Sequence, residues 1–113
     1  MNSLSDQKCT ACSGDTPKLS PGEINKSLLE LNNWTLNEEG KMISKKIPFK
    51  NFKAALKFTN LVGDLAEEEK HHPNISVGWG YCLIMIHTHA INGLSINDFI
   101  LASKIDQIIQ QNQ

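Results

Sequence analysis

The chain has 113 residues, of which 40% are hydrophobic and 20% are charged, and its formal net charge is −1. These values predict one globular domain with a hydrophobic core of its own. The longest uninterrupted apolar run, residues 82–86, is far shorter than the roughly 20 residues of a membrane helix, and the chain contains no arginine. A membrane protein and a protein that binds nucleic acid directly are therefore both disfavoured.

The first 18 residues have little apolar content, and we expect them to form an irregular or partly disordered arm ahead of a domain at residues 19–113. The N-terminus shows neither a basic start nor an apolar stretch, which favours a cytoplasmic location over secretion. Cys9 and Cys12 form a CxxC pair in this arm. A structural zinc site needs four ligands and no second pair exists, so an incidental pair is favoured over a shared metal site or a redox function.

The first regular element that the sequence predicts is a helix beginning after Ser20. Ser20 and Glu23 have the spacing of a capping box, and Pro21 stands at the first helical position, where its missing N–H costs nothing. We expect this helix to run to about Leu31.

Two pairs of strands are expected further along the chain. Residues 34–36 and 42–49 predict an antiparallel hairpin around a turn at 38–41. Residues 75–89 exceed the usual length of one strand, and the glycines on either side of Trp79 offer a turn. Two-residue periodicity then gives the last strand two faces, one with Leu83, Met85, His87 and His89 and the other with Ile84, Ile86 and Thr88.

Two more helices complete the chain. One begins at Asn51 with a wide apolar stripe and must end near His71, because Pro73 disfavours helical geometry in the residue before it. Glu67 precedes His71 by four residues and shares its face if the helix extends that far. The last helix is capped by Ser95. Its apolar residues spread over more than one stripe, so we expect it to form an oligomer interface as well as part of the core.

The expected order of elements is helix, strand, strand, helix, strand, strand, helix. This order predicts an α+β fold in which three helices pack on one face of a four-stranded antiparallel sheet. No internal repeat or low-complexity segment interrupts it.

All four histidines of the chain lie between residues 71 and 89. Imidazole exchanges protons near neutral pH, so the cluster suits general acid–base catalysis, such as a dehydration in which a hydroxyl gains a proton and an N–H loses one. Zinc binding by His71, His72, His87 and His89 is a second interpretation, although adjacent side chains in an extended segment point to opposite sides. In a third, each histidine only caps the sheet. The clustering favours a functional site over this structural interpretation.

Seven residues closely resemble, in type and spacing, the signature of the pterin-4a-carbinolamine dehydratases: Glu67, His71, His72, Pro73, Trp79, His89 and Asp98. Gly93-Leu94-Ser95 and Phe58-Thr59-Asn60 extend the resemblance, which covers about residues 20–110. Animal members of that family also serve as dimerisation cofactors of a homeodomain transcription factor.

The resemblance implies a lyase that uses no metal or other cofactor, since the pterin is its substrate. Such an enzyme removes water from 4a-hydroxytetrahydrobiopterin, the product of aromatic amino-acid hydroxylases, and gives quinonoid dihydropterin in tetrahydrobiopterin recycling. His71, His72 and His89 fall on the family's catalytic histidines. They would protonate the leaving hydroxyl and accept the N5 proton, and which residue does which stays open.

The same resemblance places Glu67, Pro73, Trp79 and Asp98 at supporting or substrate-binding positions and leaves His87 outside the signature. Asp98 is expected in the first turn of the last helix, from which its carboxylate can reach back toward the sheet. Trp79 either packs beside its turn or contacts the pterin. We expect a homo-oligomer through the last helix, and the choice between a dimer and a tetramer stays open. The alternative to an enzyme is an oligomerising module that binds and regulates a partner protein.

Overall fold

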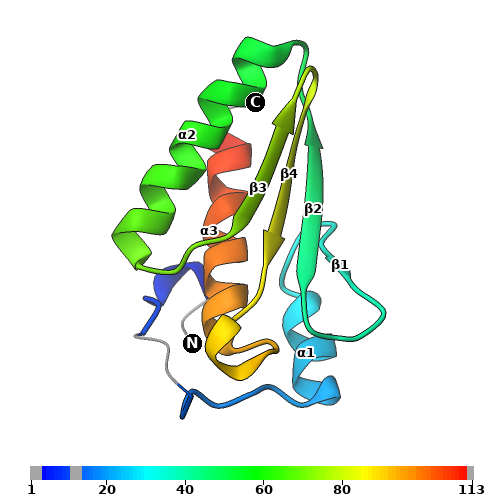
Figure 1. Ribbon diagram of the computed structural model, residues 1–113, viewed down its shortest axis with the longest axis vertical. Coiled ribbons are helices and arrows are strands. Elements are labelled where there is room, and N and C mark those ends of the chain that lie inside the picture. The colour runs from blue at the N-terminus through cyan, green and yellow to red at the C-terminus, as the bar shows by residue number, and fades with distance from the viewer. Residues whose placement is uncertain (1–3, 11–13, 112–113) are drawn as a thin grey trace.

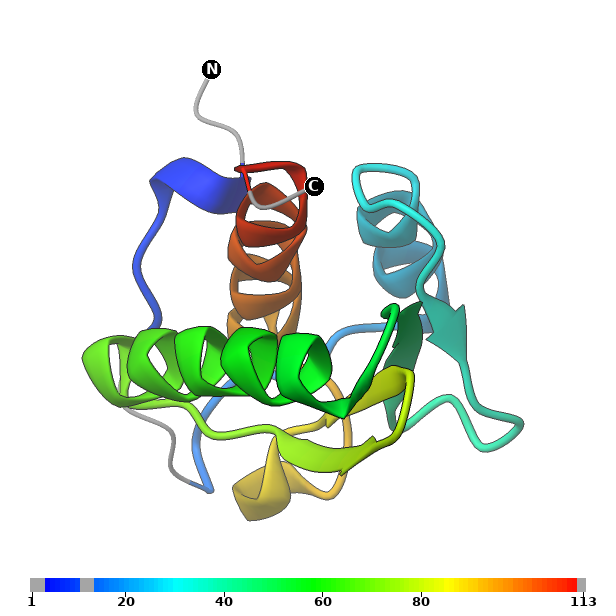
Figure 2. The same ribbon diagram turned by 90° about the horizontal axis from the view of Figure 1, so that it is seen from above.

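A four-stranded antiparallel sheet forms one layer of the protein, and α-helices cover one of its faces, as the sequence predicts (Figure 1, Figure 2). The structure, a computed structural model, describes residues 4–10 and 14–111. The strands are β1 (Thr35–Leu36), β2 (Ile43–Pro48), β3 (Asn74–Gly78) and β4 (Tyr81–Ile86), in the order β1-β2-β4-β3. The helices are α1 (Pro21–Leu28), α2 (Phe52–Glu69) and α3 (Ile96–Gln111), with single 3₁₀ turns at η1 (Leu4–Asp6) and η2 (His89–Ile91).

The first two helices begin at side-chain caps. The Ser20 hydroxyl accepts from the Glu23 amide at 3.3 Å, while the Glu23 carboxylate accepts from the Ser20 amide at 3.0 Å. This is the capping box that the spacing predicts. At the start of α2, the Asn51 side chain accepts from the Ala54 amide at 2.8 Å.

The first helix ends earlier than the predicted Leu31, and the second ends close to His71, as predicted. α1 stops at Leu28. α2 stops at Glu69, because Lys70 takes a left-handed conformation with φ of 56° and turns the chain. The condition under which Glu67 and His71 would share a helix face is therefore not met, since His71 lies beyond the helix.

β3 and β4 form a hairpin joined by the two-residue turn Trp79-Gly80, because Gly78 pairs with Tyr81. Gly80 has a φ of +81°, which strongly favours a residue without Cβ, and its carbonyl accepts from the Phe49 amide at 2.8 Å. The predicted turn around Trp79 is confirmed.

β4 ends at Ile86, earlier than the predicted strand through His89. The Thr88 amide donates to the Gly93 carbonyl at 2.9 Å, so the chain folds back and His89 enters the 3₁₀ turn η2. The prediction that His89 continues the strand is wrong for this reason. Alternation holds within the strand, where the buried residues are Cys82, Ile84 and Ile86 and the partly exposed ones are Tyr81, Leu83 and Met85.

The N-terminal half of α3 is enclosed by the rest of the single chain. Residues 97–102 are all buried, and six consecutive residues cover every side of a helix. Both α2 and η1 contact α3. The single chain thus buries much of the apolar surface of α3, whereas Ile96 is 38% exposed and Ile108 and Ile109 are half-buried. The oligomer interface on this helix stays a prediction.

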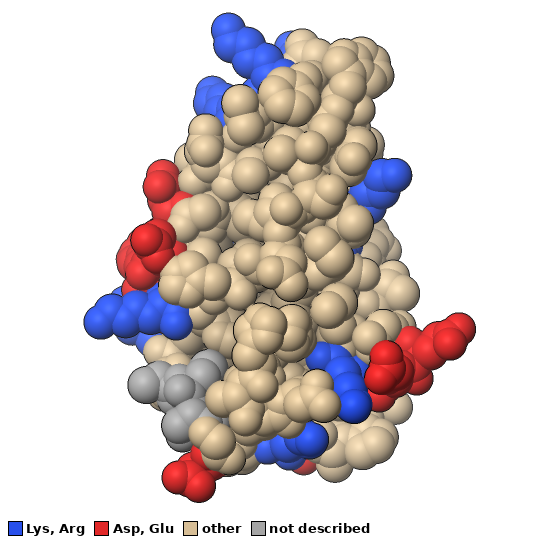
Figure 3. Space-filling view, in the orientation of Figure 1, with Lys and Arg blue, Asp and Glu red and all other residues tan. Residues whose placement is uncertain are grey.

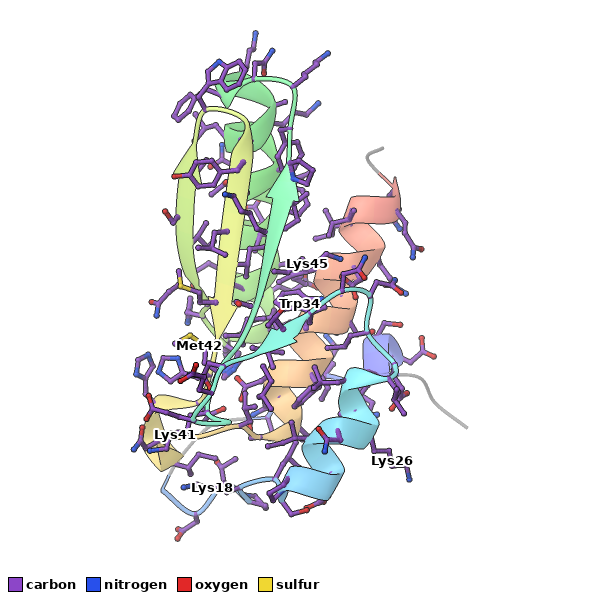
Figure 4. All side chains as sticks on the ribbon, turned by 90° about the vertical axis from the view of Figure 1, so that its right-hand side faces the viewer. Lys18, Lys26, Trp34, Lys41, Met42 and Lys45 are labelled. Atoms are coloured by element: carbon purple, nitrogen blue, oxygen red, sulfur yellow. The ribbon has the colours of Figure 1, made fainter. Side chains whose placement is uncertain are left out.

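A buried polar network ties α3 to the sheet. Asp106 accepts hydrogen bonds from Trp34 Nε1 and Lys45 Nζ, each at 2.9 Å, and from the Asn32 amide at 3.0 Å. Figure 4 shows Trp34 and Lys45 close together between β2 and α3. Three donors compensate the carboxylate for its removal from water.

The described part of the N-terminal arm packs against the helices (Figure 1). Leu4 of η1 is 4% exposed. The Cys9 amide donates to Glu69 Oε1 at 3.0 Å, and Thr10 exchanges two backbone-to-side-chain hydrogen bonds with Asn97, at 2.9 and 3.0 Å. The arm thus binds the last residue of α2 and the first turn of α3. Cys12, the second member of the CxxC pair, lies outside the described residues.

Charged side chains lie mostly at the rim of the face in Figure 3, and the centre of that face is uncharged. Within residues 4–10 and 14–111, no helix combines the length and apolar character that crossing a membrane requires.

Candidate active site

The end of α2, the segment after β4 and the start of α3 meet at one end of the sheet. A pocket of about 260 Å³ lies there, lined by Lys70, His71, His72, His87, Thr88, His89 and Ala90. All four histidines line it, so the sequence cluster is also a cluster in space. In Figure 1 this end of the sheet lies opposite the β3–β4 turn.

Asp98 is fully buried beneath this pocket, in the first turn of α3. Its Oδ2 accepts from the Thr88 hydroxyl at 2.8 Å and from the Ser95 amide at 2.9 Å, and its Oδ1 lies 2.6 Å from Nε2 of His71. Because the Thr88 hydroxyl donates to Asp98, the Ser95 hydroxyl donates to Thr88 at 2.8 Å. The carboxylate reaches back from the helix toward the end of β4, as its position in the sequence predicts.

The hydrogen bond to Asp98 fixes the tautomer of His71. The carboxylate is an acceptor, so the hydrogen between the two side chains belongs to Nε2. The His71 side chain is only 7% exposed. A short hydrogen bond to a buried carboxylate strongly restrains the ring.

His72 has a corresponding partner at the surface. Its Nε2 lies 2.5 Å from Glu67 Oε2, and the two side chains are 61% and 78% exposed. The left-handed Lys70 returns the chain toward the last turn of α2, and Pro73 favours an extended backbone at His72. The adjacent histidines therefore differ: one is buried with Asp98, and the other is solvent-exposed with Glu67.

His87 and His89 contact each other. Nε2 of His87 lies 3.1 Å from Nδ1 of His89, and the ring centroids are 4.0 Å apart. Burial and then the neighbouring His89 lower the pKa of His87 more than the Asp98 carboxylate raises it, and His71 adds to the lowering. His87 is therefore a neutral imidazole at neutral pH.

Trp79 does not join the other signature residues in this chain. It occupies the β3–β4 turn, at the opposite end of β4 from the histidines, and is 74% exposed. Packing beside the turn within the chain is therefore not observed. Pro73 connects His72 to β3 and does not line the pocket.

Three residues of the site were missed from the sequence. Thr88 and Ser95 brace Asp98, and Lys70 lines the pocket. A signal for the bracing pair exists, because Ser95 and Asp98 have capping spacing and Thr88 falls on the buried face of the strand pattern. No local pattern indicates Lys70, whose place depends on its left-handed conformation.

Among the residues that the structure describes, neither a metal site nor the larger hollow of the molecule offers the same chemistry as this pocket. Within the described parts of the chain, no group of three or more His, Cys, Asp or Glu side chains could hold a metal ion. A larger hollow of about 450 Å³ lies at the start of α2, with the lining residues Phe49, Lys50, Asn51, Lys53, Ala54, Lys57, Phe58 and Leu61. It has neither histidine nor carboxylate, so the smaller pocket is better suited to proton transfer near neutral pH.

Comparison with known proteins points to one family. The family described as "Pterin 4 alpha carbinolamine dehydratase" matches residues 17–108. A protein of Rickettsia canadensis, named as a candidate pterin-4-alpha-carbinolamine dehydratase, is 50% identical over 96% of this chain and 100% of its own length. A protein of Methylococcus capsulatus with the same name is 43% identical over 94% of this chain and 93% of its own. The crystal structure of a "transcriptional coactivator/pterin dehydratase" from Brucella melitensis has a TM-score of 0.77 and 27% identity, over 81% of this chain and 98% of that one.

Proposed function

Because the chain belongs to the pterin-4a-carbinolamine dehydratase family, we propose that it removes water from a pterin 4a-carbinolamine. The observation that carries this proposal is the pocket lined by all four histidines, within the residues that match the family. The proposed substrate is 4a-hydroxytetrahydrobiopterin and the product quinonoid dihydropterin, in tetrahydrobiopterin recycling. We further propose a homo-oligomer and a cytoplasmic location, and the resemblance supports an aromatic amino-acid hydroxylase as the source of substrate.

The reaction requires one proton to be donated and one to be accepted. The C4a–O bond breaks as the hydroxyl gains a proton and leaves as water. A C4a=N5 double bond forms as N5 loses its proton to a base. Histidine suits both transfers, because its two protonation states are both populated near neutral pH. We propose that His71, His72 and His89 share these transfers and hold the pterin.

The hydrogen bonds in the site support these roles. Asp98 and Glu67 each accept from Nε2 of one histidine, so proton transfer at the exposed His72 is assigned to its Nδ1 atom. The two carboxylates orient the rings and are positioning residues in this proposal. A reacting pterin also needs restraint, and fixed ring positions lower the entropic cost of reaching the transition state.

The proposal is tested by following the dehydration of enzymatically generated 4a-carbinolamine by absorbance. Wild-type protein should accelerate it, and a rate no better than buffer would overturn the enzyme proposal in favour of a regulatory module. His72→Gln and His89→Gln should each lower kcat by about 10²- to 10⁴-fold, the usual contribution of acid–base groups. Lys53→Gln, in the larger hollow, is the matched control and should keep the wild-type rate.

A further inference from the structure

His87 lies in the pocket but has no part in the proton transfers proposed above. It is half-buried at the end of β4, while His89 is exposed. Thr88 between them is fixed on both sides, since its hydroxyl donates to Asp98 and its amide donates to Gly93. The contact of 3.1 Å between Nε2 of His87 and Nδ1 of His89 therefore arises from a well-braced segment.

A hydrogen bond between two imidazole nitrogens needs one donor and one acceptor. If both rings carried a proton at the contact, two N–H groups would face each other, so the pair holds at most one positive charge. Nδ1 of His89 is engaged in the hydrogen bond with His87. Proton exchange with a substrate therefore takes place at Nε2 of His89.

The direction of this hydrogen bond follows from the chemistry. A histidine that gains or loses a proton at Nε2 keeps the hydrogen on Nδ1 throughout, whether it acts as acid or as base. Nδ1–H of His89 then needs an acceptor in both protonation states. A neutral His87 with a bare Nε2 supplies one. Burial, His89 and His71 each lower the pKa of His87, against the opposing effect of the Asp98 carboxylate, and this favours its neutral form.

We propose that His87 is a positioning residue that accepts the Nδ1–H of His89 and so directs Nε2 of His89 to the substrate. This inference rests on the proposed role of His89 in catalysis. It assigns to His87, which is outside the family signature, the part that Asp98 and Glu67 have toward His71 and His72.

The test compares His87→Leu with His87→Gln. Leucine removes the acceptor, whereas the glutamine side-chain oxygen reaches about as far as Nε2 and can replace it. In wild-type protein labelled with ¹⁵N-histidine, NMR should find neutral His89 with its proton on Nδ1. His87→Leu should shift this population toward the Nε2–H form, and His87→Gln should restore it. A wild-type His89 with its proton on Nε2 would overturn the inference.

Kinetics provide the second readout. His87→Leu should lower kcat about 10- to 100-fold, the usual effect of losing a hydrogen bond that orients a reactive group, with little change in KM. His87→Gln should recover most of the rate. Equal loss in both variants, with an unchanged His89 tautomer, would also overturn the inference. If wild-type protein has the Nδ1–H tautomer but no dehydratase activity, the proposed function fails while the hydrogen-bond assignment stands.

Discussion

The Asp98 carboxylate accepts a hydrogen bond from Nε2 of His71 at 2.6 Å, with both side chains buried. Asp98→Asn puts an amide, with one acceptor, where the carboxylate serves three donors. We expect kcat to fall about 10- to 100-fold through misplacement of His71, and stability to fall by about 1–3 kcal/mol. Steady-state kinetics and urea unfolding check these two effects. Asp106→Asn is the control, because it changes another buried carboxylate with three donors that lies outside the pocket. Equal kcat losses in the two variants would contradict the assignment.

Glu67 should affect activity without affecting stability. The Glu67–His72 pair is largely exposed, and such pairs contribute within about 1 kcal/mol. Glu67→Gln should therefore leave the unfolding midpoint in urea nearly unchanged while lowering kcat/KM, because His72 loses its orienting carboxylate. The neighbouring exposed residue gives the control, and Glu68→Gln should match wild type in both measurements. A wild-type kcat/KM in Glu67→Gln would remove Glu67 from the site.

Asp106 should affect stability without affecting activity. Asp106→Ala leaves the indole N–H of Trp34 and the ammonium of Lys45 without their acceptor, and breaking a buried charge pair in this way costs about 3–5 kcal/mol. Lys45→Met removes the charge but retains much of the side-chain packing, so we expect a smaller loss. Urea unfolding measures both. KM for the pterin should stay unchanged in Lys45→Met, since the network lies outside the pocket.

Glu69 should make the free energy of unfolding depend on pH in the acidic range. Burial raises the pKa of Glu69, but Lys104 at 2.8 Å and the Cys9 amide at 3.0 Å together lower that pKa below 4.5. A carboxyl whose pKa is lower in the folded state stabilises the fold above the unfolded pKa. This stabilisation disappears as the pH falls through the folded pKa. The free energy of unfolding should therefore decrease below about pH 4.5, and less steeply in Glu69→Gln than in wild type or the exposed control Glu68→Gln. Three identical pH slopes would contradict this.

Local patterns in the sequence were sufficient for most of the fold. The capping box at Ser20 and the turn at Trp79-Gly80 involve residues within a few positions of each other, and both occur as predicted. The end of β4 was not predictable in this way. It depends on Thr88 pairing with Gly93 across an intervening turn, which no strand periodicity reveals.

The candidate site was likewise predictable only in part. The histidines could be identified from their clustering, but their partners could not, because His71 and Asp98 are 27 positions apart and meet only in the folded chain. Part of the cover of α3 was unpredictable for a similar reason. Leu4 lies nearly a hundred positions earlier, in η1, which contacts α3.

The N-terminal arm limits how far the protein can be shortened without losing contacts of the folded domain. Composition places a boundary at residue 19, yet Cys9 and Thr10 hold Glu69 and Asn97, which are close neighbours of His71 and Asp98 in the chain. A protein shortened to that boundary would expose Leu4's site on the core to water and leave the Asn97 amide without its backbone partners. The segment that matches the family, residues 17–108, therefore leaves out contacts that hold the first turn of α3, and a protein shortened to it should unfold at a lower urea concentration than the full chain.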